Sequence, residues 1–195
     1  MHQQASLEAS SGGDLHQKLE QWGASAPARL EWRKKELEKW VLNRFLKLTD
    51  LLQPESFPVE IIEREKPDFL LCYNGIELGI EITTICSGTE QASLTEEEKE
   101  LKNRQGPNLL ISVPLDLNEK ITVLECAFRR ILKKKSGKRK SYGVTNCILV
   151  CYLNSPLFSK RLLDDLIESF KETAKTTTHG FLEIYVYKED SLYLL

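Results

Sequence analysis

The sequence is poor in the residues on which several common kinds of active site depend. Its three histidines, His2, His16 and His179, are scattered along the chain, so no Cys–His or Ser–His–Asp system is indicated. Its five cysteines are odd in number and include no Cys-x-x-Cys pair, which argues against disulfides and against zinc. We find no internal repeat and no glycine-rich loop that would cradle a phosphate. The sequence therefore disfavours catalysis by a cysteine or serine nucleophile with a histidine base, a zinc site, and nucleotide binding by a glycine-rich loop.

The chain also lacks a long apolar segment and a strong net charge. No apolar run approaches the roughly 18 residues of a membrane span, and residues 1–25 lack the apolar core of a secretory signal. We therefore expect no membrane association and, with most cysteines inside apolar runs as buried thiols, a cytoplasmic protein. The formal net charge of −2 argues against a uniformly basic nucleic-acid-binding surface. A chain of 195 residues, 41% hydrophobic and 29% charged, suits a single globular domain.

What the chain does contain is a hairpin signal between two carboxylates. Asn74-Gly75 lies between two apolar runs, which is a strong β-hairpin pattern. Asp68 stands at the start of the first run and Glu81 lies inside the second, so adjacent strands would bring both carboxylates to one place. Paired carboxylates of this kind are what a hard divalent cation such as Mg²⁺ needs.

The second strand of this hairpin alternates in character. Across Gly75–Thr84 aliphatic residues alternate with others, so one face would be aliphatic and the other would carry Glu77, Glu81 and Thr83. Partly buried carboxylates on that face, opposite Asp68, would be costly unless a metal ion compensated their charge. The alternative is an edge hairpin with a solvated polar face, because such alternation is ordinary in antiparallel sheets.

The order Pro67-Asp68, twelve further residues, then Glu81-Ile82-Thr83 resembles the motif of the PD-(D/E)XK nuclease superfamily. That family has an Asp after Pro, followed on the next strand by an acidic residue, an apolar residue and a Lys. Asp68 and Glu81 match the two acidic positions, whereas Thr83 stands where the Lys would be. Some branches of the family carry Thr at this position and supply the Lys from the following helix.

The resemblance, which covers about residues 32–187, implies metal-dependent hydrolysis of nucleic-acid phosphodiester bonds. Asp68, Glu81 and the carbonyl of Ile82 would hold Mg²⁺ or Mn²⁺, which polarises the phosphate and lowers the pKa of the attacking water. Glu63 and Glu38 are weaker choices for an additional outer carboxylate. The implied partner is the backbone of DNA or RNA, and the implied fold is a restriction-endonuclease-like α/β core.

The missing lysine would come from the helix expected at 121–135. The apolar face of that helix has helical spacing and is formed by Leu124, Ala127, Phe128 and Ile131. Continuing this face by three or four positions reaches Lys134 and Lys135, of which we favour Lys134 because it follows Ile131 by three. Such a cation would orient the attacking water or neutralise developing charge. The alternative is that both lysines point to solvent at a frayed helix end.

A basic segment overlaps the end of this helix. Residues 129–140 include eight basic residues and no acid. Because phosphate contacts supply most non-specific nucleic-acid affinity, this segment is the natural backbone-binding candidate. Its expected contacts, besides the two candidate lysines, are Arg129, Arg130, Lys133, Lys138, Arg139 and Lys140. The alternative is a merely solvated helix end and loop.

The remaining patterns predict an α/β fold, a mixed β-sheet flanked by helices. We expect residues 1–27 to be a flexible leader with a short helix near 14–22, and residues 28–195 to form a single nuclease-like domain. The expected elements are a helix at 29–52, strands at 59–64, 144–153 and 181–187 besides the hairpin, and helices at 94–104, 121–135 and 156–175. The run at 144–153 is continuously apolar, as in a central strand covered on both faces.

Two functions compete with a nuclease. The first is a nuclease-fold nucleic-acid-binding module that has lost catalysis, which Thr83 makes credible. The second is a protein-interaction domain, for which the basic segment and the acidic cluster at 96–100 would be contact surfaces. Metal binding separates the nuclease from both of these alternatives, and salt-dependent nucleic-acid binding separates the two alternatives from each other.

Overall fold

The structure, a computed structural model, describes residues 5–22, 34–86, 117–154 and 160–195. Within them the chain forms, in order, β1 (Ser6–Ala9), α1 (Gly12–Trp22), α2 (Lys34–Leu48), the short 3₁₀ helix η1 (Pro54–Ser56), β2 (Val59–Glu63), β3 (Phe69–Tyr73), β4 (Ile76–Ile85), α4 (Leu117–Lys138), the 3₁₀ helix η2 (Arg139–Tyr142), β5 (Asn146–Leu153), α5 (Lys160–Thr176), β6 (Glu183–Lys188) and β7 (Ser191–Leu194). The expected helix at 94–104 lies outside the described residues. None of the described helices is long and apolar enough to cross a membrane.

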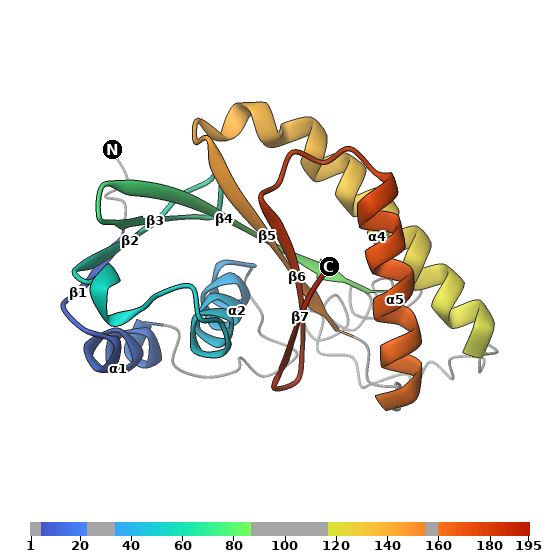
Figure 1. Ribbon diagram of the computed structural model, residues 1–195, viewed down its shortest axis with the longest axis horizontal. Helices are drawn as coiled ribbons and strands as arrows, with labels where there is room; N and C mark the ends of the chain where they lie inside the picture. The colour runs from blue at the N-terminus through green and yellow to red at the C-terminus, as the bar shows by residue number, and fades with distance from the viewer. Residues whose placement is uncertain (1–4, 23–33, 87–116, 155–159) are drawn as a thin grey trace, which may run out of the picture.

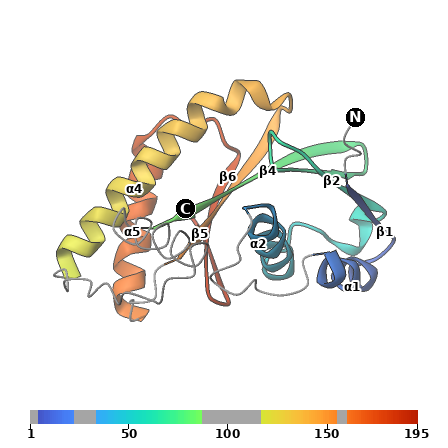
Figure 2. The ribbon, with the colours of Figure 1, turned by 180° about the vertical axis from the view of Figure 1, so that it is seen from behind.

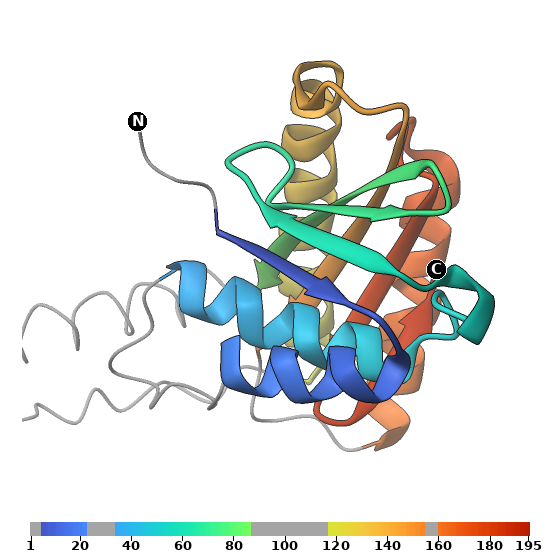
Figure 3. The ribbon, with the colours of Figure 1, turned by 90° about the vertical axis from the view of Figure 1, so that its left-hand side faces the viewer.

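The strands form one mixed sheet whose spatial order follows the chain from β1 to β7. Strands β1 to β4 are antiparallel neighbours, β4, β5 and β6 run parallel, and β7 returns antiparallel to β6. Parallel neighbours need a crossover connection, and α4 and α5 lie in the two crossovers. Helices α1 and α2 cover one face of the sheet, and α4 and α5 cover the other (Figure 1, Figure 3). The expected α/β fold, a mixed sheet flanked by helices, is confirmed.

Each face of the sheet has its own hydrophobic core. The first core packs the sheet against α1 and α2, and the second packs it against α4 and α5. Strand β5 serves both, because Ile148 and Val150 belong to the first core while Leu149 and Cys151 belong to the second. The prediction of a central strand from its continuous apolar run is therefore confirmed.

The expectation of a flexible leader is corrected by the structure. Residues 6–22 form β1, which pairs with β2, and α1, which packs on the same face as α2. The side chains that hold this segment are Leu7, Ala9, Leu15 and Leu19, all buried. These apolar residues are few and stand among polar residues. The polar composition of the segment therefore suggested a flexible leader, although Leu7 and Ala9 alternate as in a strand and Leu15 and Leu19 have helical spacing. The short helix expected near 14–22 is confirmed as α1.

The predicted hairpin is present as β3 and β4. Asn74 and Gly75 have φ values of 48° and 74°, the positive values that a two-residue type I′ turn requires. Pairing begins at the turn and ends where Phe69 faces Ile80. Strand β4 then continues to Ile85 without β3 as a neighbour, while β5 stays beside it. The sheet therefore has a notch beside β4 at the N-terminal end of β3. Helix α4 passes over β4 on one face of the sheet (Figure 2).

Candidate active site

Asp68 lies in the notch, one residue before β3 begins. Its side chain is only 2% exposed, and its Oδ2 accepts a hydrogen bond of 2.8 Å from the backbone N–H of Ile82. The carbonyl of Asp68 accepts a second bond, of 2.8 Å, from the N–H of Arg64. The side chain of Asp68 therefore bonds to the backbone of β4 just beyond Phe69, the first residue of β3.

The close approach of Pro67 to β4 explains how Asp68 is positioned. A Cβ placed on Gly79 would lie 2.8 Å from Pro67 Cγ and 2.9 Å from Val144 Cγ2, closer than real Cβ contacts. Only glycine at this position lets the buried proline ring pack against the strand. The Pro67-Asp68 pair and Gly79 thus form one local unit that fixes the Asp68 carboxylate.

Glu81 faces α4, where it meets a lysine. Its Oε1 accepts a hydrogen bond from Lys135 Nζ, and the pair is largely buried, with side chains 7% and 18% exposed. Glu81 Oε2 and Tyr142 Oη are both buried, and the Tyr142 hydroxyl lies within hydrogen-bonding range of the Glu81 carboxylate. Burial and then the charge of Glu81 raise the pKa of Tyr142 above its usual range. The carboxylate of Glu81 therefore lies between the ammonium of Lys135 and the hydroxyl of Tyr142.

The structure distinguishes between the two candidate lysines. Lys135 reaches Glu81, whereas Lys134, which the sequence analysis favoured, is exposed on the surface of α4. The preference for Lys134 was wrong because it was counted from Ile131, which is only half-buried. Its neighbour Leu132 is the residue that is fully buried in the core. Lys135 follows Leu132 by three residues, so it stands at the edge of the buried face.

Glu38 adds a third carboxylate, from α2. It is 3% exposed and forms ion pairs with Lys34 Nζ at 3.1 Å and Lys35 Nζ at 3.4 Å. From the sequence, Glu38 was only a weak candidate for an additional carboxylate of the site, although one pattern pointed to its burial. Glu38 precedes the buried Val41 and Leu42 by three and four residues, which places it on the apolar stripe of the helix.

Glu63, the other outer carboxylate considered, is engaged elsewhere. It is half-buried and pairs with Lys39 Nζ at 2.8 Å. Lys39 also lies over the ring of Trp22, with its Nζ 4.8 Å from the ring centroid. Glu63 therefore belongs to the packing of α1 and α2 on β2.

The three carboxylates share one electrostatic environment. Burial, together with the charges of Glu81 and Glu38, raises the pKa of Asp68 from 3.8 to about 7, against the Ile82 N–H and Lys135. Burial by itself lowers the pKa of Lys34, but the charges of Glu38, Asp68 and Glu81 together raise it above its usual value. A cation would therefore be more stable beside these carboxylates than in bulk water. Without a cation, Asp68 is partly protonated near neutral pH.

The oxygen donors suit a hard cation, and they are few. Asp68 and Glu81 offer carboxylate oxygens, and both side chains are buried. Oxygen ligands of this type fit Mg²⁺ or Mn²⁺ and do not fit a soft metal. In the described part of the chain, no three His, Cys, Asp or Glu side chains lie close enough to hold one ion. Ligation by these two carboxylates and the Ile82 carbonyl stays a prediction.

The basic segment divides into parts with different partners. Arg129 pairs with Glu125 at 2.9 Å on the exposed side of α4, and Lys133, Lys138 and Lys140 are exposed. Arg130, Lys134 and Lys135 line a cavity between α4 and the end of β4. These residues remain candidates for phosphate contact.

Arg139 differs from the others because its guanidinium bonds to the backbone, and its expected nucleic-acid contact stays a prediction. Its guanidinium donates to the carbonyls of Val144 at 2.8 Å, Thr145 at 2.5 Å and Gly180 at 3.2 Å. These bonds tie η2 to the start of β5 and to the segment before β6. The guanidinium of Arg139 is therefore occupied by the fold.

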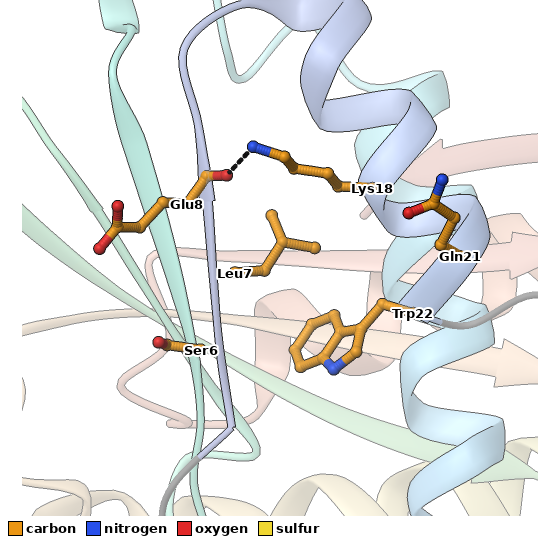
Figure 4. A pocket seen from close by; sticks show the side chains of 6 residues that line it. All are labelled: Ser6, Leu7, Glu8, Lys18, Gln21 and Trp22. Atoms are coloured by element: carbon orange, nitrogen blue, oxygen red, sulfur yellow. Dashed lines mark hydrogen bonds between the residues drawn. The ribbon is translucent and has the colours of Figure 1, made fainter.

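A shallow depression of about 550 Å³ lies at the β1 edge of the sheet. It is formed between β1 and α1, and Lys18 Nζ crosses part of it to donate to the carbonyl of Glu8 at 2.8 Å (Figure 4). Its lining residues are Ser6, Leu7, Glu8, Lys18, Gln21 and Trp22. None of the predicted site residues lines it.

Comparisons with protein-family models, with curated proteins and with solved structures find no match to this chain. The resemblance of the Pro67-Asp68 and Glu81-Ile82-Thr83 motif to the PD-(D/E)XK superfamily therefore stays a prediction from the sequence.

Proposed function

We propose that this chain is a metal-dependent nucleic-acid phosphodiester hydrolase of the PD-(D/E)XK type, with its lysine supplied by α4. The observation that carries the proposal is the contact of Lys135 with Glu81, beside Asp68 in the notch of the sheet. A carboxylate pair and a lysine meet there from three separate segments, and the position of the missing lysine, Thr83, lies two residues from Glu81.

The order of elements supports the same proposal. Helix α2, the antiparallel strands β2, β3 and β4, helix α4 and the parallel strand β5 follow one another as in a restriction-endonuclease-like core. The carboxylates come from α2, the residue before β3 and the middle of β4, and the charges of Glu81 and Glu38 both act on Asp68. Many α/β domains share parts of this order, so the site carries more weight than the topology.

Each residue has a defined task in this proposal. Asp68, Glu81 and the Ile82 carbonyl would hold Mg²⁺ or Mn²⁺, which supplies polarisation of the phosphate and a more acidic bound water. Lys135 holds its ammonium at Glu81 and donates to the attacking water or to the phosphate oxygens as charge develops. Glu38 keeps Lys34 and Lys35 at the α2 side of the notch.

A second candidate function is a nucleic-acid-binding module of the same fold without catalysis. The observation that favours it is the balance of charge, because Glu38 pairs with Lys34 and Lys35, and Glu81 pairs with Lys135. With the pKa of Asp68 raised to about 7, the cluster can exist without a cation. Such a module would keep the exposed basic residues of α4 and bind nucleic acid without metal.

Metal titration separates the two candidates. We expect heat of binding from MgCl₂ or MnCl₂ in calorimetry, and cleavage of plasmid or single-stranded substrates that EDTA abolishes. Asp68→Asn should lose both. Glu77→Gln is the matched control, because Glu77 lies on the same strand four residues from Glu81 and is exposed. Metal binding and cleavage that survive in Asp68→Asn would place the active site elsewhere, and their absence from the wild type would favour the binding module.

A further inference from the structure

A partly enclosed cavity of about 410 Å³ lies beside the candidate active site, between the end of β4 and α4. Thr83 and Thr84 line it from the strand, and Arg130, Lys134 and Lys135 line it from the helix. Its volume lies within the range of roughly 300–1,000 Å³ that is typical of small-molecule sites. Lys135 is common to the cavity and to the Glu81 pair, so the two sites adjoin.

The cavity exists for reasons that can be traced to the sequence. On the helix, Arg130 and Lys134 are four residues apart, so their side chains lie on one face. On the strand, β4 continues past the end of β3, so its last residues stand at an open edge. Thr83 is short, and a longer side chain at this position would fill the space between strand and helix.

The lining is positively charged. Lys135 is paired with Glu81, but Arg130 and Lys134 take part in no ion pair among the residues that the structure describes. Two cations therefore face the cavity without a described counter-charge, and the Thr83 hydroxyl, on the strand face that meets α4, can donate a hydrogen bond beside them. The neighbouring Arg129 differs, because it is paired with Glu125 away from the cavity.

We propose that this cavity binds a phosphate monoester, the terminal phosphate of a nucleic-acid strand whose backbone reaches the Asp68–Glu81 site. This inference rests on the proposed function. A monoester carries roughly −1.5 to −2 charges near neutral pH and three terminal oxygens, which suits two cations and a hydroxyl. An internal phosphodiester carries one charge and two such oxygens. Arg130 offers a planar fork for two of the oxygens, and Lys134 offers a point charge.

Binding measured without divalent cations tests the proposal. The probes are one short single-stranded oligonucleotide with a 5′-phosphate, with a 3′-phosphate or with hydroxyls at both ends, labelled at the end opposite the one tested. In EDTA we expect the wild type to bind one phosphorylated form roughly tenfold more tightly than the hydroxyl form, because the hydroxyl form cannot make the charge-assisted bonds. Arg130→Gln, Lys134→Gln and Thr83→Val should each reduce this ratio.

The matched controls are Arg129→Gln and Lys133→Gln, which remove the same charge from the same helix outside the cavity. They should keep the preference for the phosphorylated end. Equal affinity of the wild type for all three probes overturns the proposal, and so does a preference that survives in the cavity variants. A preference that disappears equally in the control variants overturns it too, since that would be a long-range effect of net charge.

Inorganic phosphate and a mononucleotide serve as competitors, because a free phosphate offers the same chemistry as a strand end. Competition by the mononucleotide at much lower concentration than inorganic phosphate supports a strand end. Equal competition by the two assigns the cavity to free phosphate and overturns the strand-end proposal. The readout needs no cleavage, so a protein without nuclease activity can still show the preference, and an active nuclease can lack it.

Discussion

The two ends of the basic segment 129–140 illustrate how differently similar side chains can be used. At its helical end, Lys135 reaches across to a buried carboxylate, and Arg130 and Lys134 line an open cavity next to it. At its other end, Arg139 donates all its described hydrogen bonds to backbone carbonyls of three other residues. A run of like charge therefore contains one part suited to chemistry and ligands and one part that closes the fold.

The largest effect should come from breaking the helical end. Lys135→Met should lower metal-dependent cleavage at least roughly 100-fold, because it removes the only cation that contacts Glu81 among the described residues. Lys133→Met is the control, since Lys133 is exposed two residues away and its loss should weaken nucleic-acid binding without lowering the rate at saturating substrate. Rates are measured at saturating Mg²⁺, after circular dichroism has shown that both variants are folded. A Lys135→Met protein with undiminished turnover would remove this lysine from the mechanism.

Breaking the other end should affect stability. Arg139→Gln should lower the free energy of unfolding by about 2 kcal/mol, because three carbonyls lose a charged donor. Lys138→Gln and Lys140→Gln remove exposed charges and should each change it by less than about 0.5 kcal/mol. Urea unfolding followed by fluorescence measures all three. Equal effects of the three substitutions would show that Arg139 does not tie η2 to β5.

The pH dependence of stability should separate the two regions further. Burial raises the pKa of Asp68 to about 7, against 3.8 ordinarily, so between these values the folded state binds the proton more tightly than the unfolded state does. The wild type should therefore lose stability as pH rises from about 4 to 7 in EDTA. Asp68→Asn should weaken this loss, whereas Arg139→Gln should leave it unchanged. Parallel curves for Asp68→Asn and the wild type would contradict the assignment.

The smallest effect should come from the exposed lysines on either side of Arg139. The double variant Lys138→Gln/Lys140→Gln should bind nucleic acid more weakly, and the slope of log K against log salt should fall by about 0.9 for each duplex phosphate that the variant no longer neutralises. Arg139 is left intact in this variant, so that a change in fold does not imitate a change in binding. An unchanged slope would show that this segment is only solvated.

Several features of the fold were predictable because they are local. The Asn74-Gly75 turn, the alternation along β4 and the apolar run of β5 depend on backbone preferences and on the two-residue repeat of a strand. The placement of Asp68 and Glu81 near one another follows from that hairpin. The ordered segment of β1 and α1 was not predicted, because its packing is not local. Each of these elements has only a few apolar residues, and these are buried by parts of the chain that are distant in sequence.

The sequence by itself determined the hairpin, the central strand and the two carboxylates of the notch, because neighbours along the chain specify them. Only the tertiary structure decided that Lys135 and not Lys134 meets Glu81, since the rotation of α4 is set by the packing of Leu132 against the second core. It also decided that Glu38 joins the carboxylates and that Arg139 binds carbonyls. Those contacts join segments far apart in the chain, and side chains of equal charge are distinguished only by what packs around them.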